Sequence, residues 1–330
     1  MDMSVTTKDM DSSQVNNDDV ERRPAAVLIA GPTASGKTSL AIDVARDLNT
    51  CIINADSMQI YKELHILSAR PSKEEERRAP HKLFGYVSLV EPYSVMRWLS
   101  DFEKCFRQVQ TEGKPVVVVG GTGLYFKALT EGFSHLPDIP EDVRCRWREA
   151  GLQQPSEILH ERLAEVDPVV AARLEPGDTQ RIVRALEVIE GTGQSLAYWQ
   201  QKRTPALVPF EQTIGVVLDP PRAALHERIH QRFDAMMDSG AMEEAIAVHE
   251  RQFDPSLTGM KAIGLRQLIS AHLGEESVEG AIEKAKTETR RYAKRQTTFF
   301  RGQLTKWQRI NPLNEAEVTT FRQQVRQRFL

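Results

Sequence analysis

Runs of apolar residues recur along the chain and predict the strands of one sheet. They occupy residues 27–30, 51–55, 85–90, 115–119 and 212–219. Continuous apolar runs of this length are typical of parallel strands that are covered on both faces. Apolar residues with helical spacing occupy residues 39–48, 93–111 and 225–237. The alternation of strands and helices predicts an α/β fold, a parallel sheet flanked by helices.

A glycine-rich turn joins the first predicted strand to the first predicted helix, and it fits the P-loop pattern G-x-x-x-x-G-K-[ST]. Glycine at both ends lets successive N–H groups point inward at the helix N-terminus, where the helix dipole favours an anion. Lys37 adds a positive charge, and Thr38 adds a hydroxyl ligand for Mg²⁺. We predict a phosphate or diphosphate site formed by Gly31, Pro32, Thr33, Ala34, Ser35, Gly36, Lys37 and Thr38.

Two other strand ends carry candidate chemistry. Asp56 follows strand 51–55, and ligands meet catalytic side chains at strand ends in open α/β sheets. The alternative is that Asp56 only caps a turn. Strand 115–119 opens into a second glycine turn at residues 120–123. An ATP-hydrolysing motor places an acid after such a strand to hold Mg²⁺, so the glycines argue against that activity.

The chain changes character after residue 130, where charged helices are separated by proline and glycine. A sheet strand returns only at residues 212–219, which suggests an insertion. We expect a disordered acidic tail at 1–23 and an inserted helical domain at 131–209. The P-loop catalytic core is then formed by residues 24–130 and 210–330, and its second part ends in basic helices.

Basic side chains gather near the C-terminus although the formal net charge is only −3. Residues 1–20 hold five acids and one base, a net charge of −4, so the rest of the chain carries +1. A local cluster of bases on such a nearly neutral body can still attract a polyanion. Residues 286–301 hold six bases, one acid and interleaved aromatic residues, which suits a nucleic-acid interface; a solvated basic face is the alternative. Arg228 and Arg232, four residues apart on helix 225–237, are candidate phosphate clamps.

The cysteines and the hydropathy indicate the compartment. Cys51, Cys105 and Cys145 lie far apart without a C-x-x-C motif, which argues against a disulfide framework or a zinc site. No apolar run is long enough for a membrane span, and no signal-peptide core is present at the N-terminus. We therefore expect a soluble cytoplasmic protein with no membrane partner.

Five motifs in order make the chain resemble the tRNA dimethylallyltransferase family, also called tRNA isopentenyltransferases. They span most of residues 27–305 and occupy residues 31–38, 56–61, 120–125, 178–187 and 294–301. The chain departs from the family's usual sequence at residues 67–71, 81–82, 93–98 and 264–266. None of these four departures falls on a residue that we expect to take part in catalysis.

The resemblance implies transfer of the dimethylallyl group from dimethylallyl diphosphate to N6 of the adenosine beside the tRNA anticodon, with Mg²⁺, by a monomer. Asp56 is the expected general base, because an exocyclic amine is a poor nucleophile until its proton is taken. Lys37, Thr38 and Arg232 are expected to stabilise the leaving diphosphate. The resemblance also implies contacts with the anticodon stem-loop from Asp56, Ser57, Met58, Gln59, Thr122, Arg144, Gln180, Arg181, Ile182, Val183, Arg184, Lys261, Gly264, Arg266, Lys294, Arg295, Gln296 and Arg301.

Three other functions share parts of this pattern. A small-molecule kinase shares the P-loop but binds ATP. An adenylate isopentenyltransferase shares the chemistry, yet the inserted domain and basic helices are surplus for so small an acceptor. A non-enzymatic RNA-binding module has no use for an acid beside a phosphate site.

Overall fold

Six parallel strands form a single sheet in the computed structural model, which describes residues 25–329. The strand order is β3-β2-β4-β1-β5-β6. The strands are β1 (Ala26–Ala30), β2 (Ile52–Asn54), β3 (His81–Lys82), β4 (Val116–Gly120), β5 (Thr213–Leu218) and β6 (Gln308–Ile310). The predicted fold class, a parallel sheet flanked by helices, is confirmed. The predicted acidic tail lies outside the described residues.

The central strands are buried on both faces, which explains their unbroken apolar sequences. Leu28 of β1 is level with Val118 of β4 on one side and Gly215 of β5 on the other. All five residues of β1 and of β4 are buried. Because every strand pair is parallel, the carboxyl ends of the strands meet at one edge of the sheet.

One predicted strand is wrong. Residues 85–90 do not form a ladder, and Val87 makes only an isolated bridge with Tyr61. The strand beside β2 is instead the two-residue β3. Positive φ angles at Leu83 (63°) and Gly85 (55°) turn the chain away from an extended course between β3 and residue 87.

Two compact units divide the chain, and the first comprises described residues 25–92, 104–122 and 210–329. Its helices are α2 (Lys37–Asp47), α3 (Lys73–Arg78), α11 (Arg222–Asp238), α12 (Ala241–Glu250), α13 (Leu265–His272), α14 (Val278–Gln303) and α15 (Glu315–Phe329). Short 3₁₀ turns lie at η1 (Phe210–Gln212) and η2 (Gly259–Lys261). Helix α4 (Val95–Gln110) contributes residues to both units.

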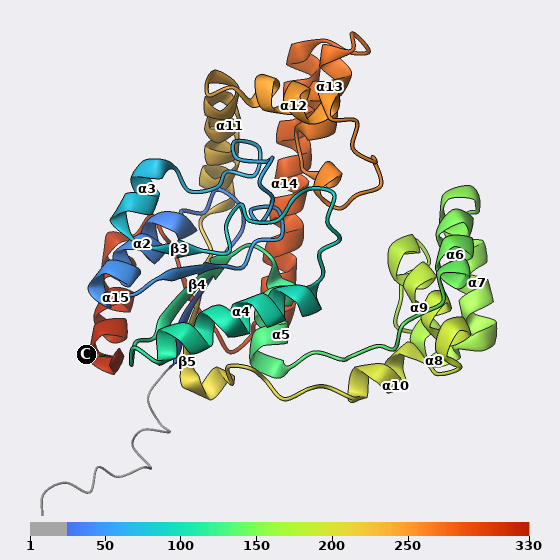
Figure 1. The fold of residues 1–330 in the computed structure, drawn as a ribbon, viewed down its shortest axis with the longest axis horizontal. Helices are drawn as coiled ribbons and strands as arrows, with labels where there is room; N and C mark the ends of the chain where they lie inside the picture. The colour runs from blue at the N-terminus through green and yellow to red at the C-terminus, as the bar shows by residue number, and fades with distance from the viewer. Residues whose placement is uncertain (1–24, 330) are drawn as a thin grey trace, which may run out of the picture. The chain divides into compact units, whose positions relative to one another are not determined.

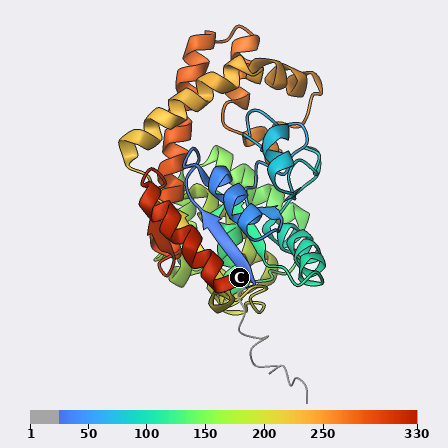
Figure 2. The same cartoon turned by 90° about the vertical axis from the view of Figure 1, so that its left-hand side faces the viewer.

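Helices α2 and α15 cover one face of the sheet and lie side by side in both views (Figure 1 and Figure 2). Leu40 and Val44 of α2 and Phe321 of α15 pack in one apolar cluster with alternate residues of the central strands. An ion pair of 2.8 Å between Arg322 and Asp47 joins the two helices at the edge of this cluster. This packing fixes α2, and therefore the loop that precedes it, against the sheet.

The second unit comprises residues 93–103 and 123–209. Its helices are α5 (Gly123–Glu131), α6 (Glu141–Gln153), α7 (Ser156–Val166), α8 (Pro168–Ala171), α9 (Thr179–Thr192) and α10 (Leu196–Gln201). Leu159 and Leu163 of α7 pack against Ile182 and Leu186 of α9 in a core of their own. Residues 131–209 lie within this unit, and their role as an inserted domain remains a prediction. In neither unit does a helix of residues 25–329 have the length and apolar character that a membrane span requires.

Candidate functional site

The P-loop lies between β1 and α2, as its sequence predicts. Gly36, just before α2, has a φ of 88°, a left-handed conformation that suits glycine. A Cβ atom on Gly31 would lie 2.8 Å from Ser35 Oγ and 3.0 Å from Leu218 Cβ, so the turn has no room for a side chain there. Ser35 Oγ is buried without a hydrogen-bond partner within residues 25–329. The loop therefore forms a tight cradle at the helix N-terminus, which favours an anion.

Two basic side chains lie at this cradle. Lys37 Nζ donates a 2.7 Å hydrogen bond to the carbonyl oxygen of Pro32 within the loop. Burial lowers the pKa of Lys37 to about 7, opposed by the negative charge of Asp56 and assisted by the positive charge of Arg232. Arg232 reaches the loop from α11 and donates to Thr33 Oγ1 at 3.3 Å, and burial lowers its pKa also.

Arg228, one turn earlier on α11, faces the same loop. A Cβ atom on Gly36 would lie 3.6 Å from its Nη1 atom. Both arginines line the cavity at the P-loop, and their role as phosphate clamps remains a prediction. Of the two, Arg232 is the one that donates a hydrogen bond to a P-loop residue within the described part of the chain.

Asp56 begins the loop after β2 and is held by two short-range hydrogen bonds. Its N–H donates to Asn54 Oδ1 at 2.8 Å, and its Oδ1 accepts from the N–H of Met58 at 3.0 Å. Asp56 thus does cap a turn, as the simpler interpretation predicted. Its carboxylate also borders the cavity beside the P-loop, so the turn fixes the orientation of a candidate base.

Gln296 of α14 connects the P-loop to the second glycine turn. Its Oε1 accepts from the N–H of Thr33 at 2.9 Å, and its Nε2 donates to the carbonyl oxygen of Gly121 at 2.9 Å. Thr122 Oγ1 accepts from the N–H of Ser57 at 2.9 Å, which ties this turn to the loop after β2. The ends of β1, β2 and β4 are therefore joined by side-chain bonds. We predicted Gln296 as a tRNA contact, and that role remains a prediction.

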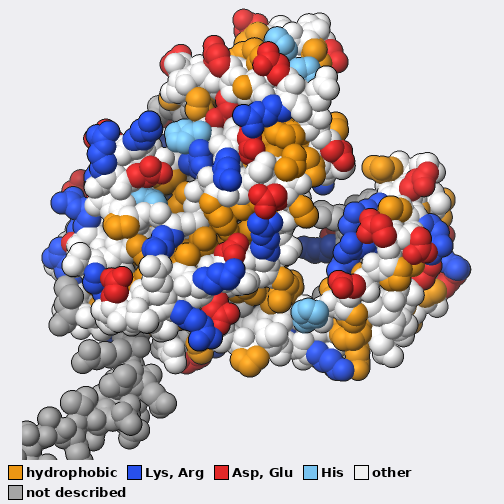
Figure 3. Space-filling view, in the orientation of Figure 1, with side chains coloured by type: hydrophobic (Ala, Val, Ile, Leu, Met, Phe, Trp, Pro, Cys, Tyr) orange, Lys and Arg blue, Asp and Glu red, His pale blue; other side chains and the backbone are white. Residues whose placement is uncertain are grey.

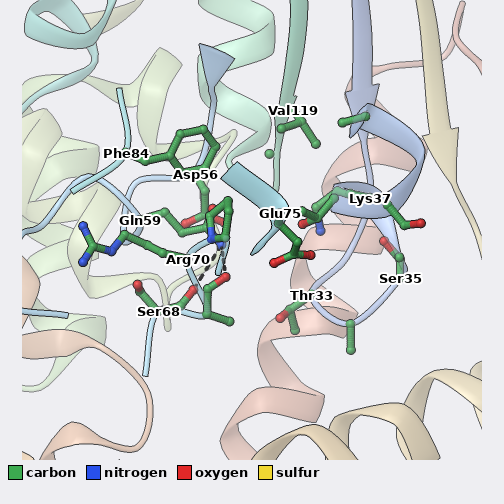
Figure 4. A pocket seen from close by; sticks show the side chains of 18 of the residues that line it. Thr33, Ser35, Lys37, Asp56, Gln59, Ser68, Arg70, Glu75, Phe84 and Val119 are labelled. Carbon is green, nitrogen blue, oxygen red and sulfur yellow. Dashed lines mark hydrogen bonds between the residues drawn. The ribbon is translucent and has the colours of Figure 1, made fainter. Parts of the chain in front are cut away.

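Two adjoining cavities share the P-loop and Asp56. The first, of about 510 Å³, has the P-loop on one side and Gln59, Ser68 and Arg70 on the other (Figure 4). The second, of about 280 Å³, extends along α11 and α14. Residues that line both cavities are Thr33, Ala34, Asp56, Ser68 and Arg232. This arrangement can hold two reactants on either side of one carboxylate.

The second cavity combines apolar and basic side chains. Ile229, Phe233 and Met236 of α11 form an apolar wall. Tyr292 of α14 also lines this cavity, and burial raises the pKa of its phenol. Sequence reasoning did not identify Tyr292 as a site residue, because an aromatic residue in a basic helix resembles one that only anchors the helix. Among the predicted tRNA contacts, those that line this cavity are Asp56, Ser57, Met58, Lys261 and Arg295.

The other predicted contacts of the first unit lie outside the second cavity. Arg266 donates to the carbonyl oxygens of Pro255 (2.8 Å) and Met260 (3.1 Å), which supports the loop before α13. Gly264 precedes α13 with a φ of 95°. Lys294 and Arg301 are exposed on α14. Arg301 lies 3.4 Å from the carboxylate of Asp219.

The predicted contacts of the second unit divide by exposure. Gln180 and Arg181 are exposed at the start of α9, whereas Ile182 and Val183 are buried in the core of the unit. Arg184 forms a 2.9 Å ion pair with the buried carboxylate of Glu187. Arg144 of α6 pairs with Glu141 at 3.1 Å. Basic and acidic side chains are mixed over the visible face of these helices (Figure 3).

The residues at the first cavity suit a metal ion that binds mainly through phosphates. Within residues 25–329 no group of three or more His, Cys, Asp or Glu side chains could hold a metal alone. Mg²⁺, however, commonly takes one or two protein oxygens and completes its shell with water and substrate phosphates. Thr38 lines the cavity and offers such an oxygen next to the cradle. The donor set therefore fits Mg²⁺ that arrives with a diphosphate.

Comparisons with known proteins agree in one family. Residues 59–303 match the family described as IPP transferase, and residues 24–81 match that described as isopentenyl transferase. A tRNA dimethylallyltransferase of Chelativorans sp. is 48% identical over 84% of this chain and 96% of its own length. That of Phenylobacterium zucineum is 48% identical over 87% of this chain and 92% of its own.

Solved structures lead to the same family. A full-length tRNA isopentenylpyrophosphate transferase from Bacillus halodurans superposes with a TM-score of 0.67 at 28% identity, over 93% of this chain and 97% of its own. A eukaryotic dimethylallyltransferase acting on tRNA gives a TM-score of 0.72 at 25% identity, over 91% of this chain and 77% of its own. The P-loop, the carboxylate beside it and these similarities together place the chain in the IPP transferase family, among the tRNA dimethylallyltransferases.

Proposed function

We propose that this prenyltransferase moves a dimethylallyl group from dimethylallyl diphosphate to N6 of the adenosine next to the anticodon of a tRNA. The observation that carries the proposal is the pair of cavities with Asp56 and Arg232 on their common border. A donor in the first cavity and an adenine in the second would meet at this carboxylate. The tRNA dimethylallyltransferases to which the chain is similar support this choice of reactants.

The P-loop cavity is suited to the donor because charge develops there. As the C1–O bond of the donor breaks, negative charge accumulates on the diphosphate. Lys37 and Arg232 are held at the P-loop by hydrogen bonds to Pro32 and Thr33, so their charges lie close to where this negative charge would develop. Thr38 would hold Mg²⁺, which when bound neutralises part of the charge on the diphosphate.

Asp56 is suited to the acceptor because one of its oxygens is fixed by the turn. The adenine must leave its stack in the anticodon loop to enter the second cavity, at a cost of a few kcal/mol (about 2–4). The N6–C1 bond then forms while the bond from C1 to the diphosphate breaks, and the N6 proton passes to the carboxylate of Asp56. A general base of this kind typically contributes about 10²- to 10⁴-fold in rate.

The choice of tRNA over a free nucleotide rests on basic residues outside the two cavities. Arg181 at the start of α9 and Lys294 on α14 are exposed cations, and neither lines a cavity that an adenylate would fill. Such cations suit contacts with the phosphates of a long polyanion. A kinase activity is disfavoured because Gly120 and Gly121 follow the valines of β4, where a motor ATPase would carry an acid for Mg²⁺.

One assay separates these activities. Purified chain is incubated with Mg²⁺ and radiolabelled dimethylallyl diphosphate, and the acceptor is unmodified tRNA or AMP; in a parallel reaction labelled ATP replaces the donor. We expect label in tRNA only, at one prenyl group per molecule. Label in AMP would indicate an adenylate prenyltransferase, and phosphoryl transfer from ATP would indicate a kinase.

A further inference from the structure

A carboxylate of α12 holds a loop that lies beside both cavities. Glu244 Oε2 accepts hydrogen bonds from the N–H groups of His65 (2.7 Å) and Ile66 (2.8 Å). Its Oε1 accepts from the N–H of Leu67 at 2.8 Å. Three consecutive backbone donors thus converge on one side chain from a helix about 180 residues later in the chain. None of the three donates to a backbone carbonyl within residues 25–329.

The same loop is held from its other end by the site itself. Gln59, next to the turn of Asp56, donates through Nε2 to the carbonyl oxygens of Ser68 (3.1 Å) and Ala69 (2.9 Å) (Figure 4). Ser68 lines both cavities, and Leu67 lines the second. The loop of residues 65–69, which we name the partition loop, therefore forms a wall at the junction of the two cavities.

Packing alone does not fix this wall. Leu67 is buried, and its side chain lies close to Gly264 and Phe233. A Cβ atom added to Gly264 would lie 3.1 Å from the side chains of both Leu67 and Phe233. His65 and Ile66 are exposed or only partly buried, so apolar contacts restrain them weakly. The carbonyl oxygens of His65 and Ile66 accept hydrogen bonds from the N–H groups of Arg70 and Ala69, which close the loop on itself. Glu244 takes the N–H groups of residues 65–67 and so ties the closed loop to α12, and bonds to a charged acceptor are stronger than neutral ones.

We propose that Glu244 is a positioning residue, which fixes the partition loop and thereby the boundary between the donor and acceptor cavities. The identity of the two ligands rests on the proposed function above. The alternative is that Glu244 only ties α12 to the rest of its unit and has no effect on ligand binding. The two roles differ in their kinetic consequences, because only the first changes the Michaelis constants (KM) of the substrates.

The experiment compares Glu244→Gln and Glu244→Ala with Glu243→Gln, a matched control on the neighbouring position of α12. A glutamine keeps one acceptor oxygen and loses the charge, whereas an alanine leaves all three N–H groups without a protein partner. We expect the KM for dimethylallyl diphosphate to rise about 3-fold in the glutamine variant and about 10-fold or more in the alanine variant. The turnover number should change less than the KM, and the control should match the wild type.

Hydrogen–deuterium exchange supplies a readout that does not depend on activity. The amides of residues 65–67 should exchange faster in the order wild type, glutamine variant, alanine variant. Unchanged KM values in both variants, with only a lower melting temperature, would mean that Glu244 only stabilises the packing of α12, and would overturn the inference. Exchange at residues 65–67 equal to that of the wild type would overturn it too. If wild-type chain fails to prenylate tRNA, the proposed function fails, while exchange and binding of dimethylallyl diphosphate still test Glu244.

Discussion

The protonation of Lys37 offers a quantitative test of the phosphate cradle. Burial lowers the pKa of this lysine to about 7, so near neutral pH the free chain holds a mixture of ammonium and amine. Only the ammonium attracts a diphosphate. Binding of the donor should therefore take up a proton above pH 7, and the affinity should fall as the pH rises.

The expected size follows from the protonated fraction. With a pKa of about 7, roughly three quarters of the chains carry the charge at pH 6.5 and roughly 3% at pH 8.5, so affinity for dimethylallyl diphosphate should fall roughly 25-fold. The stability of the free chain should change with pH in the opposite direction. The unfolded lysine keeps its proton up to its ordinary pKa of 10.5, so the free energy of unfolding should rise between pH 7 and 10.5.

Titration calorimetry measures both the affinity and the proton uptake, if it is repeated in two buffers of different ionisation enthalpy. At pH 8 we expect an uptake of about one proton per donor bound, less the donor's own contribution. The proton uptake of the donor alone is measured with Lys37→Met. In this variant the pH dependence of binding reports only the ionisation of the diphosphate. Identical pH profiles for wild type and Lys37→Met between pH 7 and 9 would refute the reasoning.

Three further predictions concern the base, the second glycine turn and the basic residues. Asp56→Asn should leave tRNA binding nearly intact and lower single-turnover prenylation by about 10²-fold or more, and a wild-type rate would remove Asp56 from the mechanism. Gly121→Ala places a Cβ 2.2 Å from Gln296 Nε2 and 3.1 Å from Asp56 Oδ2. Turnover should therefore fall by about 10-fold or more with little change in melting temperature. Full activity would show that the contacts among Gly121, Gln296 and Asp56 are not rigid. Removal of each cation that binds a tRNA phosphate should lower the slope of log affinity against log salt by about 0.7–0.9. An unchanged slope would contradict a polyanion-binding role for the set neutralised, which is Arg181, Arg184, Lys294, Arg295 and Arg301.

The parts of the site that lie close together in sequence were predictable. The P-loop is recognised because its glycines, lysine and hydroxyl all serve one ligand within eight residues, between a strand and a helix whose patterns are themselves clear. Asp56 was predictable because a buried strand ends two residues before it, and strand ends share one edge of a parallel sheet.

The parts that depend on distant partners were not predictable. Gln296 is separated from Thr33 by 263 residues, and nothing in the local sequence distinguishes a glutamine that bridges two loops from one on a surface. Glu244 in an acidic helix looks solvated until the loop that it holds is known. The expected strand at 85–90 failed for a related reason, since Val87 and Leu89 are buried in irregular backbone rather than in a ladder, while Val90 is exposed.

The strand order has a consequence for the reach of the substrate. The P-loop follows β1 and Asp56 follows β2, and the single strand between them is β4, which ends at Gly120. Neighbouring strands are about 4.8 Å apart, so the anchored phosphate and the proton acceptor are separated by about two such steps, roughly 10 Å. Backbone hydrogen bonds set this interval between the two loops, and side chains adjust only the remaining distance across the cavity. We therefore expect a donor with a single phosphate to react more slowly than the diphosphate, because a shorter leaving group holds the reactive carbon farther from Asp56.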